Sequence, residues 1–169
     1  MLTAAMNPCP CGFFGHPRKK CICTKKQVAN YLSKISGPLL DRLDLHVEVA
    51  PVEFQHLSSA SKEEETASVR KRVQAAREIQ LDRFRGTGIT CNARITSSKL
   101  REFCPLEKDA ETFLCSVFDI MGLSARAYDR ILKVGRTIAD LDGSETIRKK
   151  HISQAVQYRS LDRKYWNQE

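Results

Sequence analysis

Two pairs of cysteines near the amino terminus constrain the fold of this chain more than any other feature. Cys9 and Cys11 form one C-x-C pair, and Cys21 and Cys23 form a second pair after nine intervening residues. Two glycines in this gap let the backbone turn tightly, so that both pairs can converge on one ion. Four thiolates are the ligand set of a closed tetrahedral zinc site, and the pattern therefore predicts a structural zinc ion rather than a catalytic one.

Other interpretations of the cysteines stay open at this stage. The four could be ordinary thiols in a mobile loop, or they could have a redox role in which a disulfide joins the two pairs. His16 lies between the pairs and could replace one thiolate, although a histidine in such a loop is more often simply exposed. Cys91, Cys104 and Cys115 are irregularly spaced, and we expect them to be small core residues.

Cellular location and charge are bounded by the composition. Four of seven cysteines at a metal-binding spacing favour a reducing compartment. No apolar run approaches the roughly 20 residues that span a membrane, and residues 1–6 are too short for a secretory signal. We therefore expect a cytoplasmic protein with no membrane partner.

The net charge of +8 is divided between both parts of the chain, and it permits contact with phosphate-rich partners without requiring it.

The distribution of helix breakers indicates two modules, residues 1–60 and 61–169. Cysteine, proline and glycine are concentrated in residues 8–38, whereas the sequence after Ser61 has few breakers. The predicted fold class is mainly α, with the cysteine insertion at residues 8–24. Residues 2–6 are typical of the end of a buried strand, so we expect the chain to be a fragment of a longer protein.

Within the first module, a helix is predicted over residues 24–34, with Thr24 as its cap. A short helical turn should precede Asp41 and Arg42. After these, apolar residues alternate with polar ones over residues 45–49, a pattern typical of a strand with one buried face. Taken alone, the Asp41-Arg42 pair indicates only a surface ion pair.

The second module has the pattern of a bundle of four or five helices. Predicted segments cover residues 61–84, 97–103, 106–121, 124–141 and 148–160, with Ser124 capping the fourth. The first of these helices should bury a stripe of Val69, Val73, Ala76 and Ile79 to Leu81, and the fourth should bury Ala127, Ile131, Val134, Ile138 and Leu141. A helix-turn-helix that reads DNA fits less well, because no short turn joins a basic recognition helix to an apolar supporting helix.

Charged residues on the helix over 61–84 have a structural interpretation. The acidic run Glu63 to Glu65 lies at its start, where the helix dipole favours negative charge. Basic residues follow on and near the helix: Arg70, Lys71, Arg72, Arg77, Arg83 and Arg85. We expect them to form a solvated face in preference to a surface that contacts nucleic acid.

Three stretches of the sequence, Ala5–Gly12, Ile35–Val47 and Leu123–Arg130, together resemble the ComM family of magnesium-chelatase-like AAA+ ATPases. The resemblance spans nearly the whole chain. It implies that residues 1–60 are the end of an α/β AAA+ core with a four-cysteine zinc-binding insertion. Residues 61–169 would then form the helical lid.

The same resemblance implies catalytic roles for three residues and nucleotide contact for two of them. Asn7 resembles the sensor 1 residue, which orients the attacking water, and Arg126 resembles the sensor 2 arginine, which contacts the terminal phosphate. Arg42 resembles the arginine finger that reaches the nucleotide of an adjacent subunit. Asn7 could instead initiate the turn before Pro8, and the two arginines could be structural ion-pair residues.

The functional expectations follow from this resemblance. The parent protein would bind ATP and Mg²⁺ mainly through an upstream part, because this chain has no G-x-x-x-x-G-K-[ST] loop and should not hydrolyse ATP by itself. It would form a ring of identical subunits, expected to be a hexamer, and act on DNA as a branch-migration helicase in recombination of imported DNA. The alternatives are a chelatase-like ATPase that remodels a protein partner without acting on DNA, and a stand-alone zinc-containing binding module.

Overall fold

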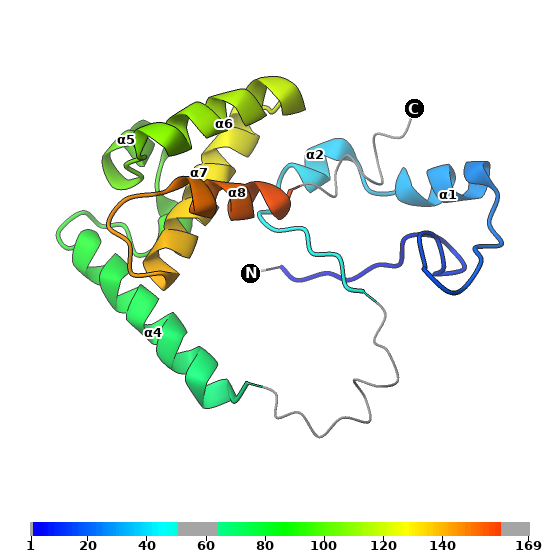
Figure 1. The fold of residues 1–169 in the computed structure, drawn as a ribbon, viewed down its shortest axis with the longest axis horizontal. Coiled ribbons are helices and arrows are strands. Elements are labelled where there is room, and N and C mark those ends of the chain that lie inside the picture. Colours follow the sequence, from blue (N-terminus) through cyan, green and yellow to red (C-terminus); the bar gives the residue numbers. More distant parts are fainter. Residues whose placement is uncertain (1, 51–63, 160–169) are drawn as a thin grey trace. The chain divides into compact units, whose positions relative to one another are not determined.

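The computed structural model describes residues 2–50 and 64–159, and the described part is mainly helical, as predicted (Figure 1). Two compact units divide the chain. The first consists of Met1–Ser58 with Arg159–Glu169, and the second of Ser59–Tyr158. No helix within the described ranges combines the length and the apolar character needed to cross a lipid bilayer.

The first unit contains two described helices, α1 (Lys25–Leu32) and α2 (Gly37–Leu40). Thr24 caps α1 as predicted: its hydroxyl accepts a hydrogen bond from Gln27 N at 3.2 Å, and Gln27 Oε1 accepts one from Thr24 N at 2.8 Å. This reciprocal arrangement satisfies two backbone N–H groups that the start of a helix otherwise leaves unpaired. Proline has no backbone N–H, but in the first turn of α2 that group would have no partner within the helix. The proline therefore favours the short helix predicted before Asp41.

The strand predicted over residues 45–49 is wrong for the described structure. These residues have no regular secondary structure, and Leu45, Val47 and Val49 are exposed, Val49 to 84%. Residues 2–6 are likewise exposed and irregular. A strand forms only when its N–H and C=O groups find a partner strand, and within residues 2–50 no β-bridge includes either segment.

The second unit is a helical bundle whose elements agree with most of the predicted segments. Its elements are α4 (Thr66–Arg83), η1 (Asn92–Arg94), η2 (Ser97–Lys99), α5 (Leu100–Phe103), α6 (Lys108–Met121), α7 (Ala125–Leu141) and α8 (Lys149–Gln157). Gly122 ends α6 in the left-handed conformation (φ +52°), and Ser124 Oγ accepts a hydrogen bond from Ala127 N at 3.1 Å as the predicted cap of α7. α7 packs against α4 and α8 around one continuous apolar core.

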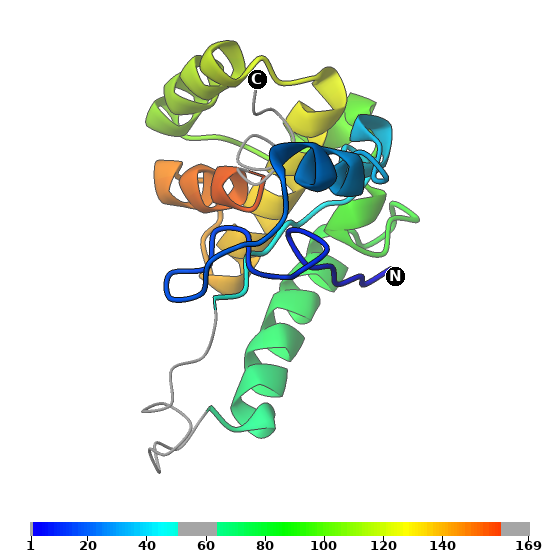
Figure 2. The same cartoon turned by 90° about the vertical axis from the view of Figure 1, so that its right-hand side faces the viewer.

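Helix α4 differs from its prediction in start and orientation. It begins at Thr66, with Glu65 as its cap residue, and residues 61–63 of the predicted range lie outside the described residues. Every residue of its first ten is exposed, and that end extends away from the other helices of the unit in both views (Figures 1 and 2). Of the predicted stripe, Ala76 and Gln80 are therefore buried, whereas Val69 and Val73 lie in solvent.

Two smaller expectations about burial also need correction. Leu141, predicted to face inward from α7, is exposed, because the helix ends there and the chain turns at Gly143 (φ +65°). Of the three isolated cysteines only Cys104 is a core residue, and burial raises the pKa of its thiol to about 11. Cys115 lies on the exposed side of α6.

A buried ion pair on α7 organises the second unit. Arg136 is 0% exposed, and its Nε donates to Asp140 Oδ1 at 3.0 Å. Arg83 of α4 also pairs with this carboxylate, with Nη1 2.9 Å from Oδ2, and Asn92 Nδ2 donates to Oδ2 at 2.7 Å. Arg136 donates further to backbone carbonyls just before α8, including that of Glu145 at 2.6 Å. The predicted solvated role is therefore wrong for Arg83.

We predict that Asp140→Asn strongly destabilises the second unit. Burial opposes the charge of Arg136 and lowers its pKa, and the neighbouring Asp140 carboxylate is the main group that counters that effect, so neutralising Asp140 removes most of the compensation for a buried positive charge. The expected loss is about 3 kcal/mol in the free energy of unfolding, measured by urea denaturation followed by circular dichroism. The matched control is Asp82→Asn, which breaks only the exposed pair with Arg85 and should cost under about 0.5 kcal/mol. Equal losses in both variants would contradict the assignment.

Candidate metal centre

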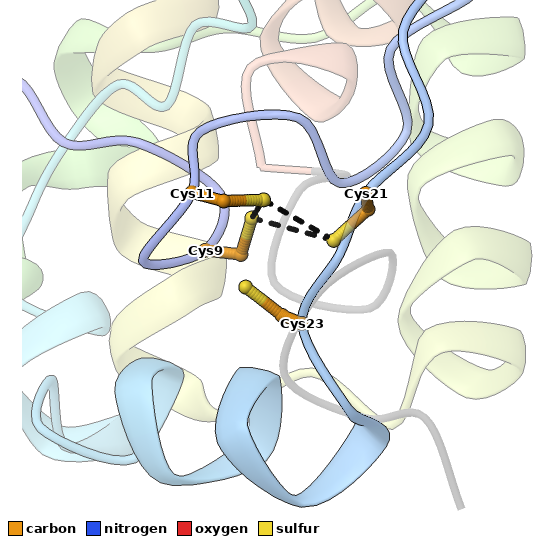
Figure 3. Close-up of side chains that lie close together, drawn as sticks. All are labelled: Cys9, Cys11, Cys21 and Cys23. Atoms are coloured by element: carbon orange, nitrogen blue, oxygen red, sulfur yellow. Dashed lines mark hydrogen bonds between the residues drawn. The ribbon is translucent and has the colours of Figure 1, made fainter.

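The four predicted cysteines converge on one point in the first unit (Figure 3). Their sulfur atoms all lie within 4.8 Å of one another. The Sγ atom of Cys9 is 3.4 Å from that of Cys11 and 3.7 Å from that of Cys21, and the Cys11 and Cys21 sulfurs are 3.5 Å apart. A zinc ion with Zn–S bonds of about 2.3 Å holds its sulfurs roughly 3.8 Å apart in a tetrahedron. The donor set therefore fits a metal such as zinc.

Local backbone structure explains why each C-x-C pair can supply two ligands. Cys21 and Cys23 lie on an irregular segment leading into α1, where side chains two residues apart can share one side (Figure 3). Cys9 and Cys11 lie in a turn that Gly12 N closes on Cys9 O at 3.0 Å. Gly12 has φ +80°, a conformation that a residue with a side chain rarely adopts.

The pKa values of the clustered thiols differ widely from one cysteine to the next. A hydrogen bond from the Phe13 backbone lowers the pKa of the Cys11 thiol to about 6, so this sulfur favours the thiolate. The Cys23 backbone lowers the pKa of Cys21, but desolvation and the hydrogen bonds with Cys11 and Cys9 outweigh it and raise that pKa to about 12. Without a cation, the four sulfurs therefore do not all ionise together, whereas a bound metal would favour four thiolates.

The cluster also forms part of a small apolar core. Cys9 is fully buried and packs with Val28 and Leu32 of α1, and Phe14 and Tyr31 lie against them. Phe14 N also donates to Cys9 Sγ at 3.3 Å, an outer hydrogen bond of the kind that orients metal ligands. Four protein ligands complete a tetrahedron and leave no position for a substrate, which is the arrangement of a structural site.

The alternative ligand His16 has a different role. Its Nδ1 atom accepts hydrogen bonds from Arg18 N and Lys19 N, both at 3.0 Å, and it lies outside the four-cysteine group. This histidine shapes the loop between the two cysteine pairs. All seven cysteines are free thiols in the structure.

The three residues predicted to sense nucleotide are exposed at the ends of well-defined local structures. Asn7 precedes the cysteine turn, and its side chain lies beside Gly12. Arg42 follows α2, and its Nη1 donates to Pro38 O at 2.7 Å. Arg126 lies in the first turn of α7, two residues after the cap Ser124. Asn7 and Arg42 belong to the first unit and Arg126 to the second, and a cleft shared by all three stays a prediction.

One residue that sequence reasoning missed supports the Arg42 segment. Arg159 is buried, its Nη1 donates to Leu43 O at 2.9 Å, and its Nη2 lies 3.5 Å from Asp41 Oδ1. The partners are separated by more than a hundred residues, and no periodic pattern in the sequence links them. Charge complementarity gave the only available signal, and it is too common to single out this pair.

Two family models match the chain, one on each side of residues 58–62. The model for magnesium chelatase subunit ChlI matches residues 1–57, and the model for the C-terminal part of that subunit matches residues 63–159. Together they cover both the cysteine cluster and the helical bundle.

Curated relatives match over almost the same extent. The chain is 42% identical to the uncharacterized protein YifB of Escherichia coli over 164 residues, and 39% identical to the competence protein ComM of Haemophilus influenzae over 163 residues. Each alignment covers 96% of this chain and 31% of the relative. The chain thus spans about a third of the length of these relatives.

We predict about one zinc ion per chain in protein purified without chelator, because the sulfur geometry fits a tetrahedral ion. Elemental analysis measures the ratio directly. Cys21→Ser should lower zinc content and weaken the thermal stability of the first unit, since it removes one ligand. Cys115→Ser, which changes an exposed thiol outside the cluster, should keep the full zinc content. A folded cluster purified free of metal would refute the zinc assignment.

Proposed function

This chain belongs to the family of magnesium chelatase subunit ChlI, and from that membership we propose that it forms part of a ring-shaped AAA+ ATPase that acts on DNA. The observation that carries the proposal is the 39% identity to a competence protein across 96% of the chain. Competence is the uptake of external DNA, so the substrate proposed here is DNA undergoing recombination after uptake. The proposed reaction is ATP-driven branch migration.

The proposed role of this chain is to sense and complete a nucleotide site whose phosphate-binding loop lies elsewhere in the full-length protein. Asn7 would orient the attacking water, and Arg126 would couple the terminal phosphate to the position of the helical lid. ATP and Mg²⁺ would be the cofactors, and zinc would hold the loop that follows Asn7. Residues 1–60 would complete the AAA+ core, and residues 61–169 would form its lid.

Arg42 supplies the argument for a ring. Arg42 lies two residues after α2 and its side chain is exposed. Arg159 contacts the residues on either side of it, Asp41 and Leu43. A guanidinium is always charged and presents several donors in a fixed plane, which suits charge that develops on a transferring phosphoryl group. A finger that acts on a neighbouring subunit requires a closed assembly of identical chains, and we propose a hexamer.

Replacing Arg42 by Ala in the full-length protein should slow ATP turnover while leaving nucleotide binding intact. Arginine fingers contribute about 10³-fold or more to kcat, so a loss of roughly that size is expected in a steady-state ATPase assay. The side chain makes an exposed contact with Pro38 O, so the fold should survive its removal. Lys34→Ala, which removes an exposed cation in the same unit, is the control. Normal turnover in the Arg42 variant would exclude the finger role.

A second candidate is a chelatase-like ATPase that remodels a protein partner without acting on DNA. The observation in its favour is that both family models describe magnesium chelatase. Binding of branched DNA by the full-length protein separates the two candidates, because contacts to phosphates weaken steeply as salt rises. We expect binding that falls with salt, measured by fluorescence anisotropy at several salt concentrations. No binding at low salt would favour the remodelling ATPase.

A further inference from the structure

The positive charge of this chain is concentrated around the metal centre. Residues 1–40 contain six basic side chains and no aspartate or glutamate, so they supply six of the eight net positive charges. The net charge of residues 1–60 as a whole is smaller than that of residues 1–40, because every acidic residue of this part follows residue 40. A zinc ion with four thiolates carries a net negative charge of two, and the basic side chains outweigh it.

These basic residues lie on the surface of the cysteine module, which we define as residues 7–34. Every lysine and arginine of the module is exposed: Arg18, Lys19, Lys20, Lys25, Lys26 and Lys34. Arg18 to Lys20 immediately precede the second cysteine pair, and Lys25 and Lys26 closely follow it. The metal cluster therefore fixes a basic loop and a basic helix start on either side of one pair of ligands.

The fold itself does not account for the lysines at the start of α1. Lys25 and Lys26 occupy its first turn, where the helix dipole disfavours cations, and this turn contains no acidic residue. The first turn of α8 also carries two lysines: Lys150 pairs with Asp142 at 2.6 Å, and Lys149 Nζ lies 5.4 Å from the centre of the Phe113 ring. In α1 the positive charge lowers helix stability slightly, so its presence indicates an external anion as partner.

Aromatic side chains are interleaved with the lysines on the module. Lys19 Nζ lies 4.9 Å from the centre of the Phe13 ring, and Lys34 Nζ lies 6.0 Å from that of Tyr31. Ile22, between Cys21 and Cys23, is 85% exposed. A surface of cations with apolar groups among them suits a polymer that offers both phosphates and bases or sugars.

We infer that the cysteine module binds the phosphodiester backbone of nucleic acid through Arg18 to Lys20 and Lys25 to Lys26. The inference rests on the proposed function for its choice of DNA, and it deepens that function by naming a contact surface separate from the nucleotide site. The basic side chains extend over a loop and a helix start, so they match an extended polyanion better than a single nucleotide.

The test compares two double variants of the full-length protein that lose the same charge. Lys25→Gln with Lys26→Gln changes the module, and Lys71→Gln with Lys108→Gln changes exposed lysines of α4 and α6 in the second unit. Binding to a labelled duplex and to a single strand of the same sequence is measured by anisotropy across a salt series. Zinc content and ATPase activity without DNA confirm that each variant is intact.

The module variant should bind DNA at least about fivefold more weakly than wild type, and the slope of log K against log salt should fall by about 1.8 if two duplex phosphate contacts are lost. The control pair should match wild type. The inference is overturned if DNA affinity falls equally in both double variants, or if it does not fall in the module variant. The proposed function still stands in either case, provided that wild-type protein binds DNA. If wild-type protein binds phosphatidylglycerol vesicles but neither the duplex nor the single strand, that result overturns both the inference and the proposed function.

Discussion

The carboxylate of Asp140 is the group on which the arrangement of the second unit depends. It is buried, and it accepts hydrogen bonds from α4 through Arg83, from η1 through Asn92 and from its own helix through Arg136. Apolar side chains can slide past one another at modest cost, but a buried charge is tolerated only where its partners meet it in one geometry. The network therefore fixes which helices meet and in what register, and the apolar core fills the space around it.

The first unit is organised by a different kind of interaction. Among its described residues, Val28 and Leu32 pack with the cysteine cluster and a few neighbouring rings, and Leu40 of α2 is also buried. A core of this size contributes little free energy against the conformational entropy of ordering the loop. A metal bound by four cysteines would add to the free energy of folding, and it would offset the repulsion among the basic side chains of the loop.

How much of this structure the sequence predicts depends on how local each signal is. The sequence predicts the caps at Thr24 and Ser124 and the end of α6 at Met121, because a helix end is decided by a few neighbouring residues. The cysteine cluster was predicted because ligand type and spacing are visible in the sequence. Arg83 and Asp140 were not paired, since 57 residues separate them and many other charges could compete.

Patterns that depend on a partner surface were interpreted less successfully. The alternation over residues 45–49 is typical of a strand, but no neighbouring strand is present among the described residues, and the segment is exposed. The stripe on α4 has helical spacing, yet Val69 and Val73 of that stripe are exposed, because the first half of the helix extends past the bundle. Such patterns indicate which face could be covered without identifying what covers it.

Because Cys9 is buried against α1, a metal bound by the four cysteines would link the lifetime of the protein to its metal supply. A chain that lost the ion would also lose the packing that keeps Val28 and Leu32 out of water, and α1 alone is too short to persist as a helix. The lysine-rich segment on either side of Cys21 and Cys23 would then become an extended substrate for trypsin-like proteases. Metal supply would in this way set how long each copy survives in the cell, independently of any effect on its activity.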